Sequence, residues 1–155
     1  MSTSIDLVPL PQKGRIIAGP AGDPNITVHQ RLWEEANILL NEWDSTLHWS
    51  YDGSIVYDVA FQDAYYVHRE SGPPGGWYLK GYSDLVWSGC SGCSYIQMLG
   101  EGNFGYIGAF DSSGTVYNNI YDNYITGRSN GSYSWTANYW LKQGFPGWHM
   151  QIWCC

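Results

Sequence analysis

Aromatic rings and amide groups crowd one stretch of this sequence and define its most distinctive chemistry. The segment from Tyr117 to Tyr124 reads Tyr-Asn-Asn-Ile-Tyr-Asp-Asn-Tyr. A sugar presents an apolar C–H face that an aromatic ring can cover, and a rim of hydroxyls that amides and carboxylates can hydrogen-bond. This chemistry predicts binding of a neutral glycan. The expected ligand-binding residues are Trp77, Tyr117, Asn119, Tyr121, Asp122, Asn123, Asn138 and Trp140.

Alternation along the expected strands predicts which of these side chains face solvent, because residues two apart share a face of a strand. In 115–121, Val116 and Ile120 are apolar and β-branched, so their face is expected to be the inner one. The outward set is then Tyr117, Asn119 and Tyr121.

In 132–141 the aromatic set is expected to be core, which leaves Asn138 and Trp140 exposed. That core set consists of Tyr133, Trp135, Ala137 and Tyr139. Trp77 follows the rigid turn Pro73-Pro-Gly-Gly76, which would present its ring to a ligand. The alternative for every one of these aromatics is burial in the core, where Trp and Tyr commonly lie in small β domains.

The four cysteines are Cys90, Cys93, Cys154 and Cys155. We expect disulfides that join the 90–93 loop to the C-terminus; a structural zinc held by the four thiolates, or free thiols, are the alternatives. Such a bridge would close a loop of about 60 residues and stabilise the fold by roughly 4 kcal/mol. Disulfides would also point to an oxidising compartment.

No catalytic residue is predicted. The histidines form no His-Glu-x-x-His or His-x-His pattern. Two carboxylates facing each other across a cleft would suit glycoside hydrolysis, but each single acid is better explained as a solvated surface residue. The acids considered are Asp52, Asp58, Asp63, Glu70, Asp84, Asp111 and Asp122. No cofactor is expected, and a calcium ion at Asp122-Asn123 would need more oxygen donors than the sequence offers there.

Composition excludes several classes of protein. The 155 residues carry 7 Lys+Arg against 14 Asp+Glu, a formal net charge of −7, so we expect neither nucleic acid nor an anionic membrane as partner. Aromatics supply 17% and charged residues 14%, which argues against disorder. No apolar run approaches the roughly 18 residues of a membrane span, so membrane insertion is not expected.

The elements that must position these residues are mainly strands. After Asp44, short segments of period-two pattern separated by turn residues predict a single antiparallel β-sandwich or barrel of about eight strands. One amphipathic helix is predicted over 28–43, because apolar residues recur there at three- and four-residue steps. Thr27 and Gln30 fit a capping box at its start. Residues 1–26 are expected to form an extended arm, and 27–155 one β-rich domain that includes the helix.

Together these features predict a non-enzymatic, lectin-like carbohydrate-binding protein. The alternative is a structural or self-assembling subunit of a coat, fibre or filament, in which the apolar arm contacts a neighbouring subunit in a homo-oligomer. A small secreted hydrolase is the third hypothesis. The expected location is extracellular, with the cytosol as the alternative because residues 1–6 lack the pattern of a signal peptide.

Overall fold

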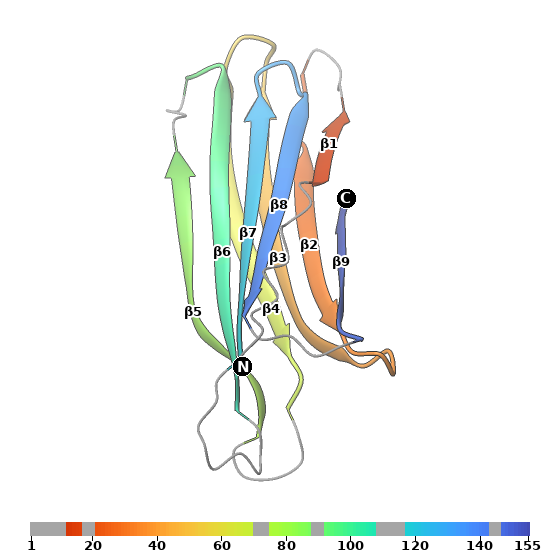
Figure 1. Cartoon of the computed structure of the whole chain (residues 1–155). Coiled ribbons are helices and arrows are strands. Elements are labelled where there is room, and N and C mark those ends of the chain that lie inside the picture. Colours follow the sequence, from red (N-terminus) through yellow and green to blue (C-terminus); the bar gives the residue numbers. More distant parts are fainter. Residues whose placement is uncertain (1–11, 17–20, 70–74, 88–91, 108–116, 143–146) are drawn as a thin grey trace.

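Two antiparallel β-sheets pack face to face in the computed structural model of the chain (Figure 1). The structure describes residues 12–16, 21–69, 75–87, 92–107, 117–142 and 147–155. Its strands are β1 (Gln12–Ile16), β2 (Asn25–Trp33), β3 (Leu39–Tyr51), β4 (Val56–Val67), β5 (Gly76–Trp87), β6 (Tyr95–Ile107), β7 (Tyr117–Arg128), β8 (Tyr133–Lys142) and β9 (His149–Cys154). The predicted class, mainly β with antiparallel sheets stacked as a sandwich, is confirmed.

The five-stranded sheet has the order β1-β8-β7-β6-β5, and the four-stranded sheet has the order β4-β3-β2-β9. Strand β1 pairs with β8 of the same chain, so this part of the expected arm extends the chain's own sheet. Residues 25 and 26, also assigned to the arm, begin β2. The other arm residues up to 20 lie outside the described part of the chain.

The predicted helix over 28–43 is wrong, because this segment forms β2, a tight turn and the start of β3. A spacing of four is even, so Val28 and Leu32 share a face of a strand as well as of a helix. Gln30 lies between them and is also fully buried, which gives the period of two. Thr27 caps no helix; its hydroxyl lies 2.9 Å from that of Thr46 on the paired strand. Asn37, with φ of 60°, forms the turn.

The segment Gly100-Glu-Gly-Asn103 has the glycine-rich composition of the turns that are expected to separate the strands. These residues lie in the middle of β6. The glycines are there because the opposite sheet approaches closely: a Cβ at Gly102 would lie 2.5 Å from Cδ2 of Trp43. The Trp43 indole also donates a hydrogen bond to the Gly100 carbonyl at 3.3 Å. Glycine inside a strand here marks close packing rather than a change of direction.

Two apolar clusters fill the space between the sheets. One contains Trp49, Met98 and Ile125, and the other contains Trp43, Phe104 and Tyr121 with their neighbours. A polar layer separates them, because on each of three strands one polar residue stands between members of the two clusters. These residues are Gln30 on β2, Ser45 on β3 and Asn123 on β7, all fully buried.

Candidate functional site

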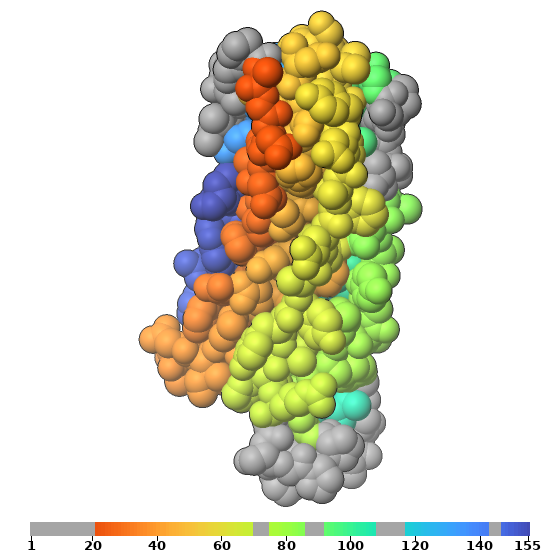
Figure 2. Space-filling view, turned by 180° about the vertical axis from the view of Figure 1, so that it is seen from behind, coloured from red at the N-terminus to blue at the C-terminus, as the bar shows by residue number. Residues whose placement is uncertain are grey.

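The two edge strands β4 and β5 face each other along one side of the sandwich. They belong to different sheets and are not hydrogen-bonded to each other. Figure 2 shows the yellow-green β4 beside the green β5 on this side of the molecule. Register places Asp63 of β4 opposite Ser45, and Asp84 of β5 opposite Gly100. We call this line of contact the seam.

A pocket of about 320 Å³ opens at the seam. It is lined by Trp43, Asp63, Tyr65, Tyr82 and Asp84. Tyr65 and Tyr82 are 55% and 66% exposed, so their rings form the outer walls, whereas Trp43 is buried and forms the base. The ring centroids of Trp43 and Tyr82 are 6.5 Å apart. The pocket therefore combines three aromatic rings with two carboxyl groups.

Glycine at position 100 makes room for this arrangement. A Cβ atom there would lie 2.2 Å from the Ser45 hydroxyl and 2.6 Å from Oδ1 of Asp63. No side chain could stand at that position of β6 without displacing the carboxyl group. Because Gly100 and Gly102 lack side chains, the sheet leaves space there for the Asp63 carboxyl group and the Trp43 ring, respectively.

The two carboxyl groups interact strongly. Burial and the Asp84 carboxyl, which lies within hydrogen-bond reach, together raise the pKa of Asp63 to about 8, although the nearby Ser45 hydroxyl acts in the opposite direction. Repulsion between the two carboxyl groups therefore favours the protonated form of Asp63. Among the described residues no well-aligned donor reaches either oxygen of Asp63 or Oδ1 of Asp84, although all three are buried.

The ion pairs found among the described residues all lie away from this pocket. The ion pairs of the described residues are His29 with Asp44, Arg31 with Glu42, and His48 with Asp23, all on the four-stranded sheet or its margin. The seam pocket is therefore acidic and rich in acceptors, and hydroxyl groups of water or of a ligand are suitable donors for it.

The polar layer of the core leads to this pocket. Gln30 Nε2 donates to Asn123 Oδ1 at 2.8 Å, and Asn123 Nδ2 donates to Ser45 Oγ at 3.2 Å. Asn123 Nδ2 also lies 3.1 Å from the Val28 carbonyl oxygen. Ser45 in turn neighbours the Asp63 carboxyl. A line of amides thus fixes the position of Ser45, and through it the inner side of the acid pair.

Half of the eight predicted ligand-binding residues are buried. Asn119, Tyr121 and Asn123 are fully buried, and Trp77 is 2% exposed. The prediction that the Tyr117, Asn119 and Tyr121 face points outward is therefore wrong. The physical reason is a polar partner on the opposite sheet: the Tyr121 hydroxyl and the Asn119 amide N–H both donate hydrogen bonds to Asn41 Oδ1.

The aromatic members of that set pack in the core instead. The Trp77 ring lies 5.5 Å from the Tyr106 ring and 5.6 Å from the Trp148 ring. Tyr117 packs against the same two rings, at 5.7 and 6.0 Å. These four rings therefore contact one another, and ligand binding by Trp77 and Tyr117 stays a prediction.

The remaining predicted residues lie on the outer face of the five-stranded sheet. Trp140 is 44% exposed, whereas Tyr133, Trp135 and Ala137 are buried, so the alternation predicted for 132–141 is confirmed. Register places Asp122 between Glu101 and Asn138. Burial raises the pKa of Asp122 to about 6, and the Glu101 charge adds to the shift. Ligand binding by Asp122, Asn138 and Trp140 stays a prediction.

The cysteines pair differently from the prediction. Cys154 and Cys155 are bonded to each other, so neither bridges to the 90–93 segment. Cys93 is also disulfide-bonded, and Cys90 lies outside the described residues. Strand β9 pairs with β2 through backbone hydrogen bonds, which hold the C-terminal strand without any cross-link to a distant segment. Sulfur atoms joined in a disulfide are not thiolates, so these cysteines do not form the alternative zinc site in this state.

One group of side chains has the composition of a metal site. His29, Glu42 and Asp44 bring ligand atoms within 4.8 Å of one another on the outer face of the four-stranded sheet. Their partners are already in place, however. His29 Nδ1 lies 2.8 Å from Asp44, and Arg31 Nε donates to Glu42 at 2.6 Å. The Arg31 guanidinium and the His29 ring both stack on Trp153. This group is best described as an ion-pair network.

The sequence analysis did not predict the aromatic walls of the seam pocket. It named Asp63 and Asp84 only among the seven acids that were considered for catalysis. A signal for the pocket does exist in the sequence. The pocket residues occur as pairs two positions apart on four strands: Trp43 and Ser45, Asp63 and Tyr65, Tyr82 and Asp84, Gly100 and Gly102. Each pair shares one face of its strand.

Comparison of the chain with protein-family models, with curated proteins and with solved structures found no match. In the described part of the chain no helix has the length and apolarity needed to cross a membrane.

Proposed function

We propose that this chain is a lectin-like protein that binds a neutral carbohydrate in the seam pocket. One observation carries the proposal: three buried carboxyl oxygens of Asp63 and Asp84 lack a hydrogen-bond donor beside two exposed tyrosine rings. Sugar hydroxyls are donors, and the C–H face of a sugar fits against an aromatic ring. The pocket offers both kinds of contact within a volume of about 320 Å³.

The chemistry of the pocket favours a neutral sugar over an acidic one. An anionic ligand would face Asp63 and Asp84 with no described cation nearby to offset the repulsion. Hydroxyl groups, in contrast, donate to carboxyl oxygens, and such bonds are shorter and stronger when the carboxyl is ionised. Tyr65 and Tyr82 come from different sheets, so a ring bound between them would contact both edges of the seam.

The spacing of the two acids favours binding over hydrolysis. Retaining glycosidases hold their carboxyl groups about 5 Å apart and inverting ones about 6.5–9.5 Å apart, so that a sugar carbon or a water fits between them. Asp63 and Asp84 are within hydrogen-bond reach of each other, which leaves no room for either. In this geometry the pair acts as one acceptor site.

The test is a screen of neutral mono- and oligosaccharides on an array, followed by titration calorimetry of each hit. We expect Tyr82→Ala to weaken binding by about tenfold, the equivalent of one lost stacking contact. Tyr65→Ala should act similarly. Tyr66→Ala is the matched control, because Tyr66 is 44% exposed on the same strand but does not line the pocket.

Two results would overturn the proposal: no neutral sugar binds at high protein concentration, or Tyr82→Ala and Tyr65→Ala bind as tightly as the Tyr66→Ala control. Trp140→Ala distinguishes the two surfaces. If Trp140→Ala alone abolishes binding, the sugar occupies the outer face of the five-stranded sheet and the seam assignment is wrong.

A further inference from the structure

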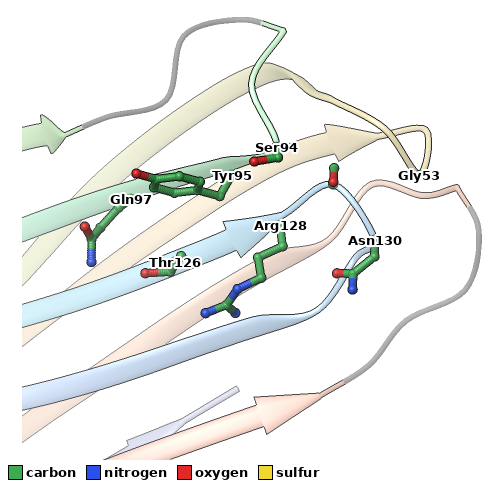
Figure 3. Close-up of a pocket in the computed structure, with 8 residues that line it drawn as sticks. Gly53, Ser94, Tyr95, Gln97, Thr126, Arg128 and Asn130 are labelled. Atoms are coloured by element: carbon green, nitrogen blue, oxygen red, sulfur yellow. The ribbon is translucent and has the colours of Figure 1, made fainter.

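A second, larger pocket lies at one end of the sandwich, far along β6 and β7 from the seam residues. Its volume is about 690 Å³. Figure 3 shows Tyr95 and Gln97 projecting from β6 beside Thr126 and Arg128 from β7, with Asn130 in the turn that follows. Tyr95 and Arg128 are direct neighbours in the register of the two strands, as are Gln97 and Thr126.

Among the described residues that line this pocket, Arg128 is positively charged and none is acidic. Every other residue that lines it is neutral and polar or is glycine. In a chain with a net charge of −7, a guanidinium surrounded by hydroxyls and amides is unusual. Among the described residues Arg128 forms no ion pair. Its Nη2 donates to the Ser134 hydroxyl at 3.1 Å, and its Nη1 is buried with no described hydrogen-bond partner.

Contacts with the core hold the backbone of Arg128 in place. Its carbonyl accepts a hydrogen bond from the Trp49 indole at 3.2 Å, and its N–H donates to the Ser132 carbonyl at 3.0 Å. Trp49 also packs under Gly127, where a Cβ would lie 2.5 Å from Cδ2 of the indole. The guanidinium therefore projects from a fixed point on a well-packed strand.

Hydrogen bonds also organise the rim of the pocket. Gly53 N–H donates to the Ser129 carbonyl and Ser129 N–H donates to the Ser94 carbonyl, both at 2.8 Å, so three separate segments are tied together. Asn130 Oδ1 accepts from the N–H and the hydroxyl of Ser132, at 3.0 and 2.7 Å. Because its oxygen is used inside the turn, the amide of Asn130 can offer only its N–H donors to a ligand.

The same turn carries the pattern Gly127-Arg-Ser-Asn-Gly131, which matches Gly-x-Ser-x-Gly. A nucleophile elbow of that pattern joins a strand to a helix, whereas this segment joins β7 to β8. No histidine lines the pocket to activate Ser129. The geometry suits binding of a ligand and not acyl transfer.

From the donors that converge on this pocket we infer a binding site for an oxyanion group, such as a carboxylate, a sulfate or a phosphate, with Arg128 as its anchor. Guanidinium and oxyanion form short, charge-assisted hydrogen bonds with defined geometry. The surrounding hydroxyl and amide donors would satisfy the remaining oxygens. This site is separate from the proposed neutral-sugar pocket at the seam and opposite to it in charge preference.

The test follows the backbone amides of the full chain by NMR while phosphate, sulfate, glucuronate or glucose is added in a chloride-containing buffer. We expect saturable shifts at Tyr95, Thr126 and Arg128 with at least one of the three anions and weaker shifts with glucose. Phosphate and sulfate without glucuronate would identify a tetrahedral oxyanion, and glucuronate alone would identify a carboxylate.

Variants separate this site from general charge effects. Arg128→Gln should weaken anion binding by about tenfold or more, because a charge-assisted hydrogen bond is lost. Arg128→Lys keeps the charge and should retain part of the affinity. Arg31→Gln is the matched control, since Arg31 is paired with Glu42 on the other sheet, and it should leave binding unchanged.

The inference is overturned if none of the three anions produces saturable shifts at these residues, or if Arg128→Gln binds as the Arg31→Gln control does. Equal binding of glucose and glucuronate would also overturn it, because the oxyanion would then contribute nothing. None of these outcomes bears on sugar binding at the seam, which Tyr82→Ala and Tyr65→Ala test independently.

Discussion

Asp63 and Asp84 bring their carboxyl groups within hydrogen-bond reach although they belong to edge strands of different sheets. Backbone contact between these two edges is made just beyond the end of β4, where the Trp77 N–H of β5 donates to the His68 carbonyl at 2.9 Å. The contact between these two carboxyl groups is therefore a further link between the two edges of the sandwich. When Asp63 loses its proton, its charge is repelled by that of Asp84 in a partly buried pocket.

The pH dependence of stability should reflect this proton. The folded chain keeps a proton on Asp63 up to about pH 8, whereas the unfolded chain releases it near pH 4. The free energy of unfolding should therefore fall as pH rises from about 4 to about 8. Asp122, with a pKa of about 6, adds a contribution of the same sign between about pH 4 and 6. Thermal melts across this range measure it.

Asp63→Asn should remove the part of this dependence above pH 6 and raise the melting temperature at pH 8, because an amide can donate to Asp84 without becoming charged. Asp52→Asn is the control. Hydrogen bonds from the backbone N–H groups of Ile55 and Ser54 lower the pKa of Asp52, so its titration falls below this window. A slope above pH 6 that survives in Asp63→Asn would contradict the assignment of this slope to Asp63.

Gly100→Ala should destabilise the fold and close the seam pocket. The added Cβ would overlap Ser45 and Asp63, and overpacking of this kind typically costs about 1–3 kcal/mol. Gly81→Ala is the matched control on the neighbouring strand, because nothing lies within 4 Å of a Cβ built there. Urea denaturation of the two variants gives the comparison. Equal stability of both would contradict the packing described for β6.

Asn123→Ala tests the polar layer between the two apolar clusters. The substitution removes one hydrogen bond each from Gln30, Ser45 and the Val28 carbonyl, although Gln30 still donates to the Asn138 carbonyl, and we expect a loss of about 2–4 kcal/mol. Asn118→Ala on the same strand removes one exposed contact, from Lys80 at 3.0 Å, and should change stability by less than about 0.5 kcal/mol. Similar losses for the two variants would mean that Asn123 is not a central part of the core.

The double substitution of Cys154 and Cys155 by serine should barely change thermal stability. A bond between adjacent residues closes no loop of the unfolded chain, so it removes little conformational entropy. We expect a change in melting temperature of about 1–2 °C by calorimetry. A bridge from this end to the 90–93 segment would instead give a drop of roughly 10 °C, which would contradict the pairing described above.

The sequence by itself determined the antiparallel β class and the inward face of β8. Both follow from local information: turn residues at short intervals, and a strict alternation in which large aromatic residues share one side of the strand. The composition also pointed to aromatic, amide and acid chemistry, although it did not assign that chemistry to the correct residues.

Only the tertiary structure decided the rest, because polar residues can be buried when a partner on the other sheet satisfies them. Gln30 lies inward because Asn123 accepts its hydrogen bond, and this turns an apparent helix into a strand. Tyr121 lies inward because Asn41 accepts a hydrogen bond from its hydroxyl group. As a result, the inner and outer faces of β7 are the reverse of those expected. Asp63 and Asp84 are 21 residues apart in sequence, and only the stacking of two sheets at the seam makes them one site.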